Sequence, residues 1–131
     1  MQFENLLKPG RIGTLELKNR IVMPGMGTIQ AGLWGEVTDR QLNWFARRAK
    51  GGAGLIIAEL ALAATAIDPI RLNAGSLRAD DIVYIPGLAR LAELIHENGA
   101  KAGIQLSPGA GGAAYAGPWT PGSQAIQKIE T

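Results

Sequence analysis

The sequence predicts an α/β fold in which strands and helices alternate in the order β-α-β-α-β. Three short apolar segments have the composition of buried strands. The two segments between them carry apolar residues at helical spacing and capping residues at their ends. Crossover helices of this kind imply parallel strands. Two architectures fit, a doubly wound sheet and the first three strands of a (β/α)₈ TIM barrel.

A small hairpin is predicted ahead of this unit. Gly10–Lys18 alternates apolar and polar residues, with Gly13-Thr14 as a tight turn. In a barrel, such a hairpin would plug the bottom. The first strand, Ile21–Met23, runs directly into Pro24–Thr28, a loop with almost no side chains.

The first helix is predicted to begin after Thr38. Gln41 follows at the position that a capping box requires. The helix ends at Gly51-Gly52. Its apolar face consists of Leu42, Phe45, Ala46 and Ala49.

The second strand, Leu55–Ala58, is predicted to end at Glu59. A second helix has Pro86 in its first turn and ends at Asn98-Gly99. Its apolar stripe consists of Leu88, Leu91, Ala92 and Ile95.

The third strand is predicted at Lys101–Leu106. It is followed by a Gly- and Pro-rich loop, Ser107–Gly122. The pattern places chemistry at the carboxyl ends of the strands, because both candidate architectures do so. Two of these three ends are loops with few side chains, which suits a flat or anionic ligand lying on backbone amides.

The composition predicts a soluble globular chain with residues 1–131 in one domain. Hydrophobic residues make up 47% and charged residues 18%. The net charge is +2 and the basic residues are scattered, so no nucleic-acid partner is expected. No apolar run approaches the roughly 20 residues of a membrane span, and no signal peptide is evident. The chain has no cysteine, which excludes disulfides and thiolate metal sites and fits a cytoplasmic location.

One segment matches the residue pattern of a dinucleotide-binding fingerprint but lacks the structural context that the fingerprint needs. Gly109–Ala114 matches G-x-G-x-x-A, but Gly117-Pro118 and Pro121-Gly122 break the helix that this motif needs. Gly25–Gln30 lacks the third glycine.

Two polar residues lie within or beside the apolar strands. Gln105 is a lone amide in A-G-I-Q-L and is expected to be buried, where it either ties down a loop or binds the donor–acceptor edge of a heterocycle. Glu59 is either an acid–base group or a structural carboxylate that caps the strand or pairs with Arg71 or Arg78.

The other candidates have ordinary structural interpretations. His96 is expected to be a solvated residue near a helix end. Trp44 is expected to pack on its helix, whereas Trp34 and Trp119 follow strands and would line a pocket mouth.

Several motifs together resemble one family. The opening F-x-x-L-L-K-P-G-R-I-G-T-L-E-L-K-N-R-I-V-M-P-G-M-G-T is similar to the N-terminus of the old yellow enzyme family, the NADH:flavin oxidoreductases that include 2,4-dienoyl-CoA and enoate reductases. The segments G-G-A-G-L-I-I-A-E and L-I-H-E-N-G-A-K-A-G-I-Q-L fall where this family has its second and third barrel strands.

The resemblance implies a TIM barrel that binds FMN and passes hydride from NAD(P)H to an activated C=C bond of an unsaturated carbonyl compound. It places Pro24, Gly25, Met26 and Gly27 beneath the flavin ring, where small residues let the backbone lie close. It places Leu60 beside the flavin through its backbone, and Gln105 on the pyrimidine edge.

The sequence also departs from the family pattern. Many relatives carry a side chain where this chain has Gly27, and a smaller residue in place of Leu60. After Gln105 the chain reads L-S-P-G-A-G-G instead of L-x-H-x-G-R. A full barrel needs about 250 residues, so the resemblance places the catalytic residues, the flavin phosphate site and any iron–sulfur cysteines beyond Thr131.

Two other functions remain open. One is a non-flavin barrel enzyme of the aldolase or lyase type that uses Glu59. The other is a non-catalytic partial barrel that works only with a complementary chain. If the chain forms only part of a barrel, we expect it to self-associate or to pair with a complementary chain.

Overall fold

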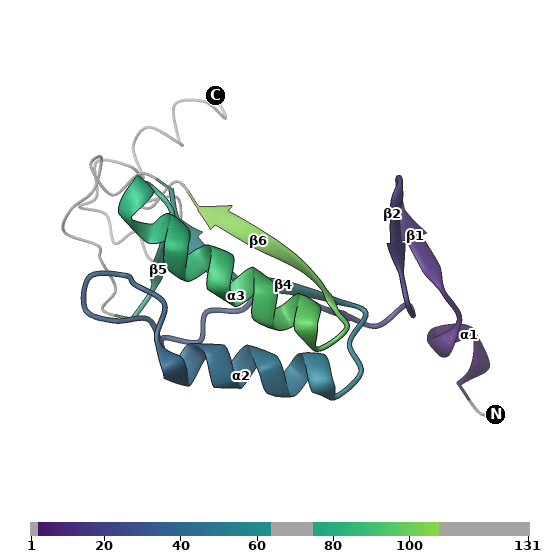
Figure 1. Cartoon of the computed structure of the whole chain (residues 1–131). Coiled ribbons are helices and arrows are strands. Elements are labelled where there is room, and N and C mark those ends of the chain that lie inside the picture. Colours follow the sequence, from purple (N-terminus) through teal and green to yellow (C-terminus); the bar gives the residue numbers. More distant parts are fainter. Residues whose placement is uncertain (1–2, 64–74, 108–131) are drawn as a thin grey trace, which may run out of the picture.

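The N-terminal segment forms a small unit of its own. In this computed structural model, which describes residues 3–63 and 75–107, it consists of α1 (Glu4–Leu7), β1 (Gly10–Ile12) and β2 (Leu15–Leu17). β1 and β2 pair antiparallel where the sequence predicts a hairpin, and Gly13 in their turn has a φ of +58°. The unit lies beyond the end of the main sheet where β4 begins (Figure 1). That it plugs a barrel stays a prediction.

The main sheet is built from parallel strands. β6 (Lys101–Ser107) runs along one edge of β4 (Leu55–Leu62). β3 (Val22–Met23) and β5 (Leu77–Arg78) share the opposite edge of β4, the first at its start and the second at its end. The predicted parallel order of the three main strands is confirmed, whereas β5 is an additional strand that the sequence analysis did not predict.

The predicted end of the second strand is wrong. β4 continues past Glu59 to Leu62, and its ladder with β6 steps from Ala58↔Ile104 to Leu60↔Gln105. Two residues of β4 therefore advance for one of β6, which is the count of a β-bulge. Glu59 is the extra residue.

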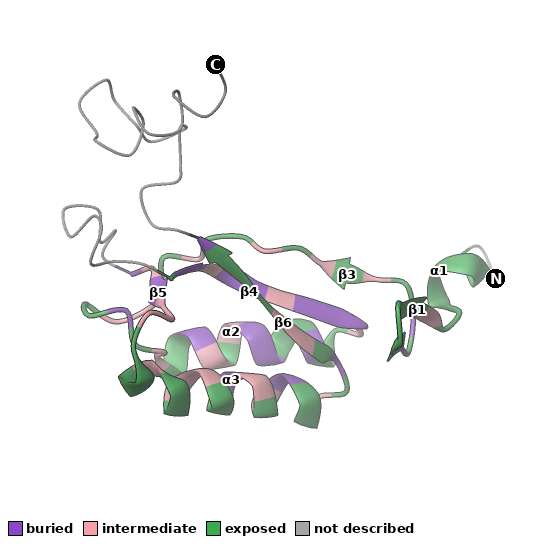
Figure 2. Ribbon diagram, turned by 90° about the horizontal axis from the view of Figure 1, so that it is seen from above, coloured by how far each residue is buried: buried purple, intermediate pink, exposed green. Residues whose placement is uncertain are grey.

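Both long helices cover one face of the sheet (Figure 2). α2 (Asp39–Lys50) follows Thr38, whose Oγ1 accepts a hydrogen bond of 3.2 Å from the Gln41 N–H, as predicted. The other half of the predicted capping box is wrong, because Gln41 Oε1 accepts no hydrogen bond from Thr38 and the Gln41 amide donates to Glu59 instead. α3 (Ile85–Glu97) has Pro86 in its first turn and follows a short 3₁₀ turn. No helix in the described part of the chain is long and apolar enough to cross a bilayer.

The core lies between this helix pair and the sheet. Phe45 of α2, Ile56 of β4 and Leu77 of β5 are 0% exposed. Trp44 packs edge-to-face on Phe45 with ring centroids 4.9 Å apart, in agreement with its predicted packing role. The Arg48 guanidinium lies 3.5 Å from the Trp44 ring centroid. The helix pair is thus packed tightly onto one face of the sheet.

Replacing Thr38 by alanine is expected to lower the free energy of unfolding by about 1 kcal/mol, because the cap of α2 is lost. Thr38 Oγ1 also donates to the Gln30 carbonyl at 2.6 Å, so the change frees the preceding loop as well. Urea denaturation measures the loss. Thr38→Ser keeps the hydroxyl and should retain most of the stability; equal losses in both variants would contradict a capping role.

Candidate functional site

Two of the predicted site residues lie side by side on the face of the sheet that the helices leave free. Ile56 and Ala58 of β4 pack into the core with the helices. Because side chains alternate along a strand and the bulge adds one residue, Leu60 faces the other way. Leu60 is paired with Gln105 of β6. Both residues are thus at the carboxyl ends of their strands.

The loop after β3 lies against Gln105. An ideal Cβ placed on Gly25 would overlap Gln105 Oε1 and lie 3.0 Å from Cδ and 3.1 Å from Cβ of the same side chain. Only glycine allows this approach without displacing the amide. Closeness to Gln105 is thus one reason for a glycine at position 25, and the expected closeness to a flat ring stays a prediction. Around a Cβ placed on Gly27 there is no atom within 4 Å, so that position faces open space.

The expected burial of Gln105 is wrong. Its side chain is exposed, as are Pro24, Met26 and Gly27, while Leu60 is half-buried. The cause is that neither long helix covers this face of the sheet. Within the described residues, the Gln105 amide makes no hydrogen bond, so both its donor and its acceptor are available at the open face.

Glu59 occupies a different place from the one predicted. Its side chain is only 1% exposed and accepts hydrogen bonds from the Thr28 N–H and from Gln41 Nε2. The predicted pairing with Arg78 is wrong, since Arg78 binds Asp80; Arg71 lies outside the described residues. The carboxylate therefore points into the helix layer, behind the open face.

Gln41 is a site-supporting residue that the sequence analysis considered only as part of a capping box. It is 0% exposed, in the first turn of α2. Its position four residues before Phe45 places a polar side chain on the apolar face of the helix. A polar residue on the apolar face of a helix indicates a buried polar partner, and this is the sequence signal that could have revealed the contact between Gln41 and Glu59.

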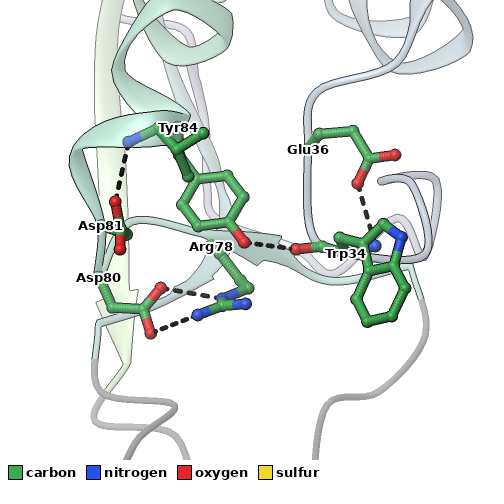
Figure 3. A network of polar contacts seen from close by, with 7 residues as sticks. Trp34, Glu36, Arg78, Asp80, Asp81 and Tyr84 are labelled. Carbon is green, nitrogen blue, oxygen red and sulfur yellow. Dashed lines mark hydrogen bonds and ion pairs between the residues drawn. The ribbon is translucent and has the colours of Figure 1, made fainter.

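A second polar network joins the loop after β3 to the segment after β5 (Figure 3). Arg78 Nε and Nη2 donate to the two carboxylate oxygens of Asp80 at 2.9 and 3.0 Å. This hydrogen bonding raises the pKa of the Arg78 guanidinium above its ordinary value, although burial opposes the shift. The Tyr84 hydroxyl donates to the Trp34 carbonyl at 2.8 Å, and the Trp34 N–H donates to Glu36 Oε2 at 3.0 Å. These contacts hold the loop after β3 to the segment after β5.

The remaining predicted positions divide into two groups. His96 is exposed in the last turn of α3, as expected for a solvated residue. The Trp34 side chain is 72% exposed, and its role at a pocket mouth stays a prediction. Trp119 and the motif at Gly109–Ala114 lie outside the described residues. Among residues 3–63 and 75–107, no group of three His, Cys, Asp or Glu side chains is placed to hold a metal ion.

Comparison with known proteins assigns the chain to a family. The model of the NADH:flavin oxidoreductase / NADH oxidase family matches residues 5–124. An NADH oxidase of Thermoanaerobacter brockii is 44% identical over 116 residues, covering 82% of this chain and 17% of the oxidase. A metal reductase of Desulforamulus reducens is 43% identical over 101 residues, covering 77% of this chain and 14% of the reductase.

Solved structures agree with this assignment. A 2-naphthoyl-CoA reductase in complex with 2-naphthoyl-CoA superposes with a TM-score of 0.72 at 30% identity, covering 79% of this chain and 15% of that one. The old yellow enzyme of Pichia sp. AKU4542 gives a TM-score of 0.70 at 27% identity, covering 78% and 26%. The chain spans 14–17% of the length of the two curated relatives above. It belongs to the old yellow enzyme family of NADH:flavin oxidoreductases.

Proposed function

We propose that this chain supplies the first three barrel strands and one wall of the FMN site in an enzyme that passes hydride from NAD(P)H to an activated C=C bond. The enone, enoate or dienoyl thioester class of acceptor is proposed. FMN, when bound, supplies the hydride acceptor and donor. The observation that carries the proposal is the loop at Gly25 packed against the exposed amide of Gln105 beside Leu60.

The residues present fit a flavin. The Gln105 amide offers both a donor and an acceptor, which a heterocycle with mixed polarity on its edge requires. Gly25 and Gly27 have no side chains, so the loop backbone can approach a flat ring at these two positions. In this proposal Gln105 holds the pyrimidine edge, Pro24–Gly27 lie beneath the ring, and Leu60 contributes its backbone.

One structural relative supports an unsaturated thioester as the acceptor. One structural relative is a reductase bound to 2-naphthoyl-CoA, an aromatic thioester, and others are old yellow enzymes. A second relative is an NADH oxidase, which supports a nicotinamide donor. The catalytic residues are proposed to lie outside this chain.

An open apolar groove supports a further part of the proposal, that residues 1–131 form a partial domain completed by more polypeptide. The groove has a volume of about 270 Å³ and lies between α3 and β6, next to Ala58 of β4. Within the described part of the chain, β6 pairs with β4 alone, so its other edge is open. The groove is lined by Ala58, Leu88, Leu91, Ala92, Ile95, Ala102, Gly103 and Ile104.

The holoprotein, meaning this chain joined to the polypeptide that completes the barrel, tests the proposal. We expect it to purify with a flavin absorption spectrum, to release FMN on denaturation, and to reduce an enone with NAD(P)H. A colourless holoprotein that cleaves aldol substrates in a Glu59-dependent way would overturn the flavin assignment in favour of a lyase.

Replacing Gln105 by leucine is expected to weaken FMN binding by the equivalent of one or two buried hydrogen bonds, about 1–3 kcal/mol. The fold should stay intact because the side chain is exposed. FMN affinity and reduction potential of the holoprotein are the measurements. Asn43→Leu, which changes an exposed amide on α2, is the matched control and should alter neither.

Gly25→Ala gives a cross-check on the same contact, because the new Cβ displaces the Gln105 amide. The part of its effect on FMN affinity that acts through the Gln105 amide should vanish when Gln105 is already leucine, so the two changes should not be additive. If flavin content and potential were unchanged by Gln105→Leu, the amide would have no role in flavin binding.

A further inference from the structure

The loop at Pro24–Gly27 is held at both of its ends by the structure behind it. At its start, Met23 pairs with Ile56 in the sheet. Directly after it, the Thr28 N–H donates to Glu59, a side chain that is 1% exposed. Four residues therefore span the gap between a strand and a buried carboxylate.

Glu59 reaches this loop because of the bulge in β4. As the extra residue between Ala58 and Leu60, it faces the helix layer together with Ala58 instead of the open face. Its other oxygen accepts from Gln41 Nε2, and Gln41 is 0% exposed. Both oxygens thus have an N–H donor, as a buried carboxylate requires.

The start of α2 completes the attachment. The Gln41 N–H donates to Thr38 Oγ1 at 3.2 Å, and Thr38 Oγ1 donates to the Gln30 carbonyl at 2.6 Å. The loop is therefore fastened at Thr28 and again at Gln30, both times to groups that α2 orients. We call Glu59, Gln41 and Thr38 the loop clamp.

We propose that Glu59 is a positioning residue for the flavin site. Through the loop clamp it sets the distance between Pro24–Gly27 and the flavin ring, and it does not itself touch the ring. This rests on the proposed function, which places that loop beneath FMN. It assigns to the carboxylate neither an acid–base step nor a contact with substrate. The physical basis is that the side chains of this loop contribute little packing, since Pro24 and Met26 are exposed and the other two residues are glycines, so the anchors at its ends largely position it.

The test is Glu59→Gln in the holoprotein, alone and combined with Gln41→Glu. In the single variant, one of the two N–H donors faces an amide nitrogen, so one hydrogen bond is lost. In the double variant, the amide at position 59 accepts from Thr28 through its oxygen and donates through its nitrogen to the carboxylate at position 41. Glu93→Gln, on an exposed carboxylate of α3, is the matched control.

Two measurements are made on each variant. Hydrogen exchange of the segment 24–30, measured without FMN, should accelerate about tenfold in Glu59→Gln, as expected for the loss of one buried hydrogen bond. The flavin reduction potential and FMN affinity should shift in the same variant. The exchange rate and the two flavin properties should return toward their original values in the double variant. All three should stay unchanged in Glu93→Gln.

The outcomes separate this inference from the proposed function. Unchanged exchange in Glu59→Gln would overturn the loop clamp, whatever the flavin does. Faster exchange with unchanged flavin properties, while Gln105→Leu alters them, would overturn the positioning role and leave the proposed function standing. A holoprotein that binds no FMN at all would overturn both.

Discussion

Replacing Phe45 by alanine is expected to lower the free energy of unfolding by about 3–5 kcal/mol, the usual range for removing a buried aromatic side chain. Phe45 is 0% exposed and lies between α2 and the sheet, in the same cluster as Ile56 and Leu77. Its ring also supports Trp44. Small domains are stable by only about 5–15 kcal/mol, so the variant should be close to unfolding.

Urea denaturation of the chain measures this loss. Leu33→Ala is the control, because Leu33 is 78% exposed and its replacement should change stability by less than about 0.5 kcal/mol. A loss below about 1 kcal/mol for Phe45→Ala would mean that the layer between α2 and the sheet is not tightly packed.

The 131-residue chain by itself is expected to show no FMN-dependent oxidation of NAD(P)H. A barrel site is assembled from the ends of several strands. In the proposed flavin site, the described residues of this chain would contribute only the loop after β3, Leu60 and Gln105. The family resemblance places the phosphate-binding residues, the substrate-binding pair and the proton donor on later strands.

An assay of NAD(P)H oxidation with added FMN and an enone tests this expectation. The rate with the chain should equal that of free FMN, whereas the holoprotein should turn over under the same conditions. The mass in solution is measured alongside, because self-association of the isolated chain through the apolar groove beside β6 is expected. Stoichiometric FMN-dependent turnover by a monomer of the chain would contradict the prediction.

The elements that the sequence predicts well are those with local signals. The start of α2 is marked by Thr38, whose side chain accepts a hydrogen bond from the backbone N–H of Gln41, three residues later. Pro86 marks the first turn of α3, and Asn98-Gly99 marks its end. In each case the cause and the effect lie within one helical turn, so a single sequence is enough.

The errors concern residues whose environment comes from distant parts of the chain. Glu59 looks like a strand end because carboxylates are seldom buried. Its partners lie 18 and 31 positions away, and only the fold brings them together. Gln105 looks buried because its neighbours are apolar, whereas its exposure depends on which face the helices cover. The Leu77–Arg78 strand is too short to leave a periodic pattern.

The bulge in β4 allows evolution to change Glu59, the carboxylate that holds the loop, without changing the pairing of the sheet. The partners Ala58↔Ile104 and Leu60↔Gln105 are already consecutive steps of the ladder, with Glu59 between them as a supernumerary residue. A lineage can therefore gain or lose this carboxylate through one codon without shifting any later side chain of β4 to the wrong face. An insertion or deletion elsewhere in β4 has no such latitude, since it exchanges the two faces of the strand from that point onward.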